Sequence, residues 1–229
     1  MINFKNVTKV FESGSRPIIA VEDVSFNVEC GEFVSIVGRS GAGKTTLLKL
    51  LLAEEKPTSG AILFEDENVH HLRHDALPRF RRSIGVVFQD YKLLPTKTTY
   101  ENIAYVMEVI GATDEHIASD VTHVLDLVGL TDRAYSFPEE LSGGERQRAA
   151  IARALIHRPH VILADEPTGN LDPYHTRDII KLLAKVNELG TTVILATHNQ
   201  EIINTLQRRV ITLDNGKVVR DEERGRFTL

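Results

Sequence analysis

Apolar residues are grouped along this chain in short continuous runs that alternate with stretches of helical period. Four of these runs contain almost no polar position, and they lie at residues 33–37, 84–88, 161–164 and 193–197. Continuous apolar runs of this length are typical of strands that are buried on both faces of a parallel sheet. The pattern therefore predicts an α/β fold in which helices connect the strands of a largely parallel sheet.

Apolar and polar residues alternate in three further segments, at residues 2–7, 24–28 and 61–64. Alternation of this kind predicts strands with one buried face, so we expect a separate antiparallel part near the N-terminus. Glycine, serine and proline gather at residues 13–17. This is the only linker-like tract of the chain, and we expect it to be a surface loop.

The strand pattern stops after Gln89 and resumes at about residue 159. Helical periodicity replaces it at residues 99–110, 116–128 and 144–157. Gly111, Gly129 and Pro138 interrupt that periodicity. We therefore expect a helical subdomain at residues 89–158, inserted into a core formed by residues 1–88 and 159–229 of a single domain.

A glycine-rich segment, Gly38-Arg39-Ser40-Gly41-Ala42-Gly43-Lys44-Thr45, joins the strand at 33–37 to a predicted helix at 46–53. It fits the pattern G-x-x-x-x-G-K-[ST], in which backbone N–H groups surround phosphate oxygens. Lys44 would reach the β- and γ-phosphates, and the Thr45 hydroxyl would hold Mg²⁺. A glycine loop can also simply turn a corner, but the flanking strand and helix favour phosphate binding. The candidate ATP-binding residues here are Gly38, Ser40, Gly41, Ala42, Gly43, Lys44, Thr45 and Thr46.

Two adjacent carboxylates, Asp165 and Glu166, follow the apolar run at 161–164. Acidic side chains at the carboxyl end of a buried strand are well placed to serve a nucleotide site. Asp165 is suited to the Mg²⁺ shell, and Glu166 is suited to polarise the attacking water. The alternative is a solvated turn, which the nearby phosphate-binding pattern makes less favourable.

A second glycine-rich segment, Leu141-Ser142-Gly143-Gly144-Glu145, precedes the helical pattern at 144–157. Ser142 is a good N-cap, so the segment can begin a helix whose N-terminal N–H groups meet a phosphate. If this segment and the loop at 38–45 both serve one nucleotide, two copies of the chain must come together. The sequence therefore predicts a homodimer that forms on ATP binding, with Ser142, Gly143, Gly144 and Glu145 acting across the interface.

These motifs, together with Gln89, the segment Gly169-Asn170-Leu171-Asp172 and His198, occur in the order found in ABC-type ATPases. The resemblance covers nearly the whole chain. It implies the P-loop NTPase fold of that family, with a mixed-sheet core, an antiparallel β subdomain and an inserted helical subdomain. By this resemblance, Gln89 links Mg²⁺ and water to a membrane partner, His198 lies near the γ-phosphate, and Asp172 communicates between the two sites. Taken alone, Gln89 and His198 could be ordinary exposed residues.

The resemblance also bears on the nucleotide. The family places an aromatic residue near Phe11 to stack on adenine, although a core role for Phe11 remains open. No Asn-Lys-x-Asp segment of the GTPase kind occurs, which favours ATP over GTP. Asn199 departs from the family pattern, because an aspartate often follows the switch histidine there.

Three segments, at residues 89–95, 98–104 and 108–111, closely resemble the bacterial cell-division members of the family. The resemblance implies an integral membrane partner of the FtsX type that docks near Tyr91, Leu93 and Leu94. It also implies peripheral attachment to the cytoplasmic face of the cell membrane and control of peptidoglycan hydrolysis at the septum. One alternative is the ATPase subunit of a lipoprotein-release or macrolide-type exporter. Another is a soluble ABC ATPase acting on DNA or ribosomes.

Composition agrees with these expectations. Lys and Arg number 27 against 32 Asp and Glu, and a net charge of −5 gives no support for a nucleic-acid partner. Cys30 is the only cysteine, which excludes an intrachain disulfide and suits a reducing compartment. No apolar run is long enough to span a bilayer, so we expect any membrane role to come through a partner.

Overall fold

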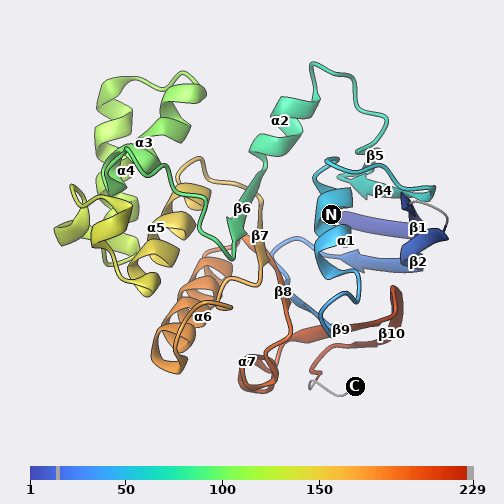
Figure 1. Ribbon diagram of the computed structural model, residues 1–229. Coiled ribbons are helices and arrows are strands. Elements are labelled where there is room, and N and C mark those ends of the chain that lie inside the picture. Colours follow the sequence, from blue (N-terminus) through green and yellow to red (C-terminus); the bar gives the residue numbers. More distant parts are fainter. Residues whose placement is uncertain (14–15, 226–229) are drawn as a thin grey trace. The chain divides into compact units, whose positions relative to one another are not determined.

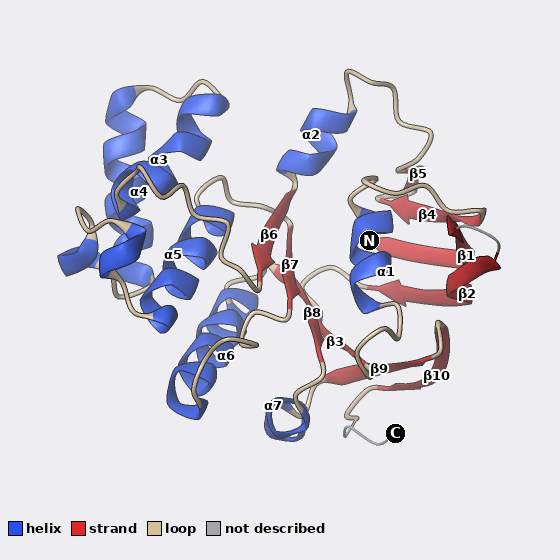
Figure 2. Ribbon diagram, in the orientation of Figure 1, coloured by secondary structure: helices blue, strands red, loops and turns tan. Residues whose placement is uncertain are grey.

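The computed structural model describes residues 1–13 and 16–225, and the chain divides into two compact units (Figure 1). The first unit contains Met1–Arg81 and Gly190–Leu229, and the second contains Arg82–Leu189. Both combine helices with strands (Figure 2). The sequence pattern divides the chain differently, with a helical subdomain at residues 89–158. That division stays a prediction.

An antiparallel sheet forms one part of the first unit, with strand order β2-β1-β4-β5. Alternate side chains of β2 are buried at its C-terminal end, namely Val24, Phe26 and Val28. The Phe26 ring stacks on Phe4 of β1 with centroids 4.4 Å apart. The strands are β1 (Ile2–Ser13), β2 (Arg16–Val28), β4 (Ser59–Phe64) and β5 (Glu67–Asn68).

The first two strands extend further than their sequence patterns indicate. Register shifts between Phe4 and Val7, and again on either side of Lys9, break the alternation of apolar and polar residues. Ser13 pairs with Arg16, so the expected loop at 13–17 is wrong for the paired residues. Residues 14 and 15 of that expected loop lie outside the described residues.

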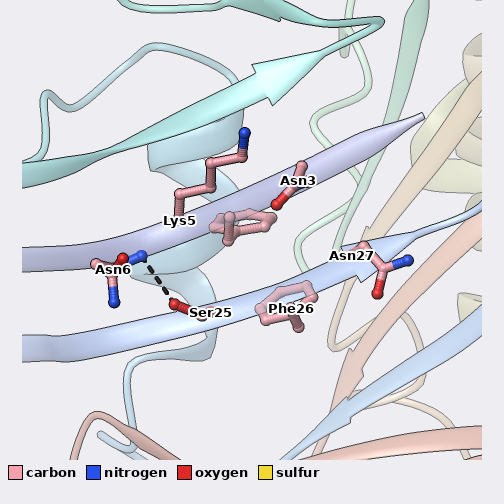
Figure 3. A pocket seen from close by; sticks show the side chains of 7 residues that line it. Asn3, Lys5, Asn6, Ser25, Phe26 and Asn27 are labelled. Atoms are coloured by element: carbon pink, nitrogen blue, oxygen red, sulfur yellow. Dashed lines mark hydrogen bonds between the residues drawn. The ribbon is translucent and has the colours of Figure 1, made fainter.

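A shallow depression of about 390 Å³ lies on this sheet between β1 and β2 (Figure 3). Asn6 has a left-handed φ of 48°, and its N–H donates to the Ser25 hydroxyl over 2.8 Å (Figure 3). The Asn6 carbonyl lies so close to Gly60 of β4 that a Cβ atom on Gly60 would collide with it. The lining residues are Asn3, Phe4, Lys5, Asn6, Ser25, Phe26 and Asn27.

A second sheet of the first unit has the order β10-β9-β3-β8. Strand β3 is parallel to both β8 and β9, and β9 is antiparallel to β10, so the sheet is mixed. Every residue of β3 is buried, as its apolar run predicts. The elements are β3 (Phe33–Val37), β8 (Thr192–Thr197), β9 (Arg209–Asp214) and β10 (Lys217–Glu222), with helices α1 (Lys44–Leu51), α2 (Leu77–Arg82) and α7 (Gln200–Leu206).

The second unit combines two parallel strands with the predicted helices. Helix α5 packs on β6 and also contacts α3, α4 and α6 (Figures 1 and 2). No helix of the described residues is long and apolar enough to cross a bilayer. The elements are β6 (Ile84–Phe88), β7 (Val161–Asp165), α3 (Thr99–Val109), α4 (Asp114–Leu127), α5 (Gly143–Leu155) and α6 (Pro173–Glu188), with short 3₁₀ helices at Thr131–Arg133 and Pro138–Glu140.

Asn102 organises the segment that leads into α3. Its side chain is 1% exposed and its Nδ2 donates to the carbonyls of Leu94, Lys97 and Thr98 over 2.9 to 3.1 Å. Its Oδ1 accepts from the Leu94 N–H over 2.7 Å. A buried amide therefore holds both backbone groups of Leu94, and this turn depends on one side chain.

The substitution Asn102→Asp replaces the donating Nδ2 with an oxygen that faces three carbonyls. Burial favours the neutral acid, so the pKa of the new carboxyl rises above about 3.9 and stability is lost as pH increases past that value. At pH 7 we expect a loss of about 3 kcal/mol in the free energy of unfolding, measured with urea.

The matched control is Gln207→Glu, the same change from amide to acid at an exposed residue directly after α7, which we expect to change stability by less than about 0.5 kcal/mol. An Asn102→Asp protein as stable at pH 7 as the parent would contradict the assigned role of this amide.

Candidate active site

The glycine-rich loop of the first unit leaves β3 at Val37 and enters α1 at Lys44. Gly43 is the N-cap of α1 with φ of 102°, and no side chain caps the helix. The first turn of α1 also has no acidic residue. The positive end of the helix macrodipole is therefore not compensated by a carboxylate, as an anion site requires.

Two glycines of this loop lie where backbone carbonyls leave no room for a side chain. A Cβ atom on Gly43 would lie 2.5 Å from the Ala20 carbonyl oxygen of β2, and one on Gly38 would lie 2.5 Å from the Leu213 carbonyl oxygen of β9. The carbonyl of Ala42 accepts from the Gly216 N–H over 3.2 Å. The loop is thus fixed between β2 and the turn after β9.

Lys44 folds back over the loop that precedes it. Its side chain is buried, and its Nζ donates to the carbonyls of Gly38 over 2.9 Å and Arg39 over 3.2 Å. Ser40, Gly41 and Thr45 are exposed on the same loop and helix start. Two backbone carbonyls therefore hold the ammonium group at the loop, where a cation suits a bound phosphate.

His198 reaches the same edge of the sheet through strand register. Val37 pairs with Thr197 in the parallel β3–β8 ladder, so Gly38 and His198 both follow paired strand ends. Asn199 caps α7 by accepting from the N–H groups of Glu201 and Ile202 over 3.0 and 3.3 Å. The departure from aspartate at this position therefore preserves the cap.

Phe11 lies on β1, away from the hydrophobic core. Its ring is half-buried, and the Lys9 Nζ lies 4.6 Å from the ring centroid. Its partner on β2, Ile18, is 55% exposed. The core alternative for Phe11 is therefore wrong, whereas stacking on adenine stays a prediction.

In the second unit, Gln89, Asp165 and Glu166 come together in the same way. Phe88 pairs with Asp165 in the parallel β6–β7 ladder, and Gln89 and Glu166 follow that pair. Glu166 has a left-handed φ of 47°, and its carbonyl accepts from the Gly169 N–H over 3.1 Å. The chain thus turns sharply where the carboxylates stand.

Gln89 is also tied to the turn that precedes α6. The Asn170 Nδ2 donates to the Gln89 carbonyl over 3.2 Å, and the Gln89 Nε2 donates back to the Asn170 Oδ1 over 3.4 Å. A Cβ atom on Gly169 would lie 2.8 Å from the Gln89 Nε2. Gln89 therefore contacts the segment that ends at Asp172.

Ser142 begins α5 through a capping box. Its hydroxyl accepts from the Glu145 N–H over 3.3 Å, and the Glu145 carboxylate accepts from the Ser142 N–H over 2.8 Å. Arg133 forms an ion pair with Glu145 at 3.0 Å. The hydrogen bond from the Ser142 N–H is the main cause that lowers the pKa of Glu145, followed by the Ser142 side chain. The exposed Ser142 is thus held in place by local bonds.

Asp172 begins α6 in a comparable way. One carboxylate oxygen accepts from the N–H groups of Tyr174 and His175 over 2.9 and 3.1 Å, and the other contacts the His175 Nδ1. The His175 side chain is the main cause that lowers the pKa of Asp172. Sequence reasoning missed His175. A histidine three residues after a capping aspartate was the available signal. Its contact with a different helix could not be predicted from the sequence.

The expected site residues thus form two groups, one in each unit. The first unit brings the loop at 38–45 together with His198, and the second brings Gln89 together with Asp165, Glu166 and Asp172. Their joint action on one nucleotide stays a prediction.

Gly43 and Gly41 provide a matched test of the loop geometry. Both have positive φ, 102° and 81°, but a Cβ atom on Gly41 would have no neighbour within 4 Å. We expect Gly43→Ala to lower the free energy of unfolding by about 1 to 3 kcal/mol more than Gly41→Ala, because only the former strikes a backbone carbonyl. Thermal unfolding of both variants measures the difference. Equal losses would show that left-handed strain, and not the contact with Ala20, makes glycine necessary.

Comparison with known proteins agrees with this geometry. A family model described as ABC transporter matches residues 21–169. The cell division ATP-binding protein FtsE of Streptococcus pneumoniae serotype 2 is 51% identical over 99% of this chain and 97% of its own length. FtsE of Bacillus subtilis is 48% identical over 99% of this chain and 98% of its own length.

Solved structures show the same fold. The ATP-binding cassette MJ0796, determined as a dimer in a post-hydrolysis state with ADP and Pi, has a TM-score of 0.89 and 38% identity, covering 99% of this chain and all of that one. The expected fold class is confirmed. By the family model and these relatives, this chain belongs to the ABC transporter family and is an ATPase of the ABC type.

Proposed function

We propose that this chain is the ATPase subunit of an ABC-type system for bacterial cell division. The observation that carries the proposal is identity of about half the residues over nearly the full length of FtsE proteins. Methionine import ATP-binding proteins of the MetN type are 42% identical, but the chain spans only 66% of their length. Whole-length agreement therefore supports cell division over import. Nothing observed favours the exporter alternative.

The phosphates are bound by the loop of the first unit. Its backbone N–H groups and the positive end of α1 surround the β- and γ-phosphates, and Lys44 exchanges its carbonyl partners for phosphate oxygens. Phe11 stacks on the adenine ring. A stacked ring forms no hydrogen bonds with the edge of the base, so it contributes affinity more than discrimination between ATP and GTP.

Mg²⁺ fits the donors that this chain offers. The Thr45 hydroxyl, the Gln89 side-chain carbonyl and the Asp165 carboxylate are hard oxygen ligands of the kind Mg²⁺ prefers. Among the described residues, no group of three or more His, Cys, Asp or Glu side chains could hold a metal by itself. Bound together with the nucleotide, Mg²⁺ would complete its shell with phosphate oxygens and water, as is usual for this ion. When bound, it neutralises charge that develops on the phosphates.

Hydrolysis follows from charge placement and a positioned water. Glu166 orients the attacking water, while Lys44 and His198 compensate the γ-phosphate. Ser142, Gly143 and Gly144 of a second copy complete the phosphate contacts, with Glu145 holding Ser142 in place. Two ATP molecules are thereby enclosed at a two-fold interface, and Asp172 connects the two sites. Loss of the γ-phosphate removes the charge that joined the copies, so the dimer opens.

The membrane partner is of the FtsX type, and it docks on the segment after Gln89. Leu94 is 37% exposed while Asn102 fixes its backbone, so an apolar side chain is presented from a rigid turn. Leu93 and Tyr91 adjoin it. This attachment keeps the chain at the cytoplasmic face of the membrane without a span of its own, and the opening of the dimer drives the partner that regulates septal peptidoglycan hydrolysis.

The substitution Glu166→Gln tests the catalytic and dimer assignments together. The amide can still accept from water but is a poor base, so we expect turnover to fall at least about 100-fold with ATP binding retained. Size-exclusion chromatography with ATP should show an accumulated dimer, and the added substitution Ser142→Ala should return it to a monomer. Near-normal turnover would exclude Glu166 from this role. A monomer at saturating ATP would contradict the dimer.

The substitution Leu94→Asp tests the docking site. A charge on an apolar contact should lower co-purification of the FtsX-type partner by at least about tenfold, because desolvating a carboxylate in an interface is costly. The control is Val219→Asp on β10, also an exposed apolar residue, which should leave co-purification intact. Equal melting temperatures of both variants and the parent exclude misfolding. Full partner binding by Leu94→Asp would contradict the assignment.

A further inference from the structure

One histidine of the second unit connects two segments that the proposed function places at the dimer interface. His175 lies in the first turn of α6, and Gly144 lies in the first turn of α5. Asp172 is the N-cap of α6. The imidazole touches both Asp172 and Gly144, so it bridges the turn before α6 and the start of α5.

The contact with Gly144 leaves no space for a side chain. A Cβ atom on Gly144 would collide with the His175 Cδ2 and would lie 2.9 Å from Cγ and 3.2 Å from Nε2. Because Cγ is close to the backbone of α6, the ring cannot easily swing away from such a group. Gly144 is itself buried. Glycine at this position therefore admits the imidazole, a role separate from any contact with phosphate.

The contact with Asp172 uses the carboxylate oxygen that capping leaves available. Oδ1 accepts from the backbone N–H groups of Tyr174 and His175, and Oδ2 contacts the His175 Nδ1. Both oxygens are then held, which fixes the plane of the carboxylate as well as its position. Without the imidazole, a capping carboxylate could rotate about its own bond while keeping the cap.

We propose that His175 is a positioning residue for the ATPase reaction: held by Asp172 and seated against Gly144, it fixes the Asp172 turn and the start of α5 as one body. The proposal rests on the proposed dimer, in which Asp172 and residues 142–144 both act on the neighbouring copy. A shift of Asp172 is then carried directly to the residues that meet the γ-phosphate. His175 does not itself touch the nucleotide.

Two substitutions separate the hydrogen bond from the ring. Phenylalanine at His175 keeps a ring against Gly144 but cannot donate to Asp172, whereas asparagine places its Nδ2 where the imidazole carries Nδ1. We expect His175→Phe to lower kcat about tenfold, as for the loss of one charge-assisted hydrogen bond, while binding of a fluorescent ATP analogue stays within about twofold. His175→Asn should recover at least half of the parental kcat. Parental kcat in His175→Phe, or equal losses in both variants, would overturn the proposal.

A double-mutant cycle with Asp172→Asn examines the pair directly and remains informative if His175→Phe folds poorly. Asparagine preserves the N-cap of α6 and removes the carboxylate that binds the imidazole. The double variant should be no slower than the slower single variant, within about twofold, because both changes remove one interaction. Losses that multiply would overturn the pairing.

Ser142→Ala, assayed in parallel, distinguishes a failure of this inference from a failure of the proposed function. If Ser142→Ala turns over ATP at the parental rate, the dimer site fails and the positioning role fails with it. If Ser142→Ala is inactive while His175→Phe has the parental kcat, only the role of His175 is overturned.

Discussion

The in-register pairing of parallel strands determines where the residues of nucleotide chemistry leave the sheets. Val37 is level with Thr197 in the first unit, and Phe88 is level with Asp165 in the second. Parallel strands end at the same edge, so the residues that follow each pair emerge together without needing contacts of their own. A slip of one residue in either ladder would turn each side chain of the strand to the opposite face of the sheet and displace the residue that follows the strand.

Close approach of a neighbouring group, permitted by glycine, fixes both the glycine-rich loop and the start of α5. The Ala20 carbonyl lies where Gly43 has no side chain, and the His175 ring lies where Gly144 has none. Gly43 is the N-cap of α1 and Gly144 lies in the first turn of α5, where backbone N–H groups have no partner within the helix. The missing side chain thus lets a neighbouring group pack closely against each glycine, and it leaves the backbone N–H groups at the helix start accessible.

The sequence was sufficient for features that depend on local pattern. The buried strands, the glycine-rich loop and the N-cap at Ser142 each depend on a few neighbouring residues. Features set by distant partners were not readable. Register shifts interrupted the alternation along β1 and β2, and no pattern marked Asn102 as the side chain that holds the turn before α3. The contact of His175 with Gly144 joins segments that are far apart in the sequence. The roles of the site residues depend further on how two units and two copies cooperate, which no local pattern encodes.

Asn199 occupies a position where the family often has aspartate. The N-cap of α7 is retained with asparagine in that place. Its side-chain oxygen accepts from the N–H groups of Glu201 and Ile202 as a carboxylate would. The difference is electrostatic: the amide next to His198 carries no charge. A polyanion approaching this edge of the sheet therefore meets one negative charge fewer than it would with an aspartate at position 199.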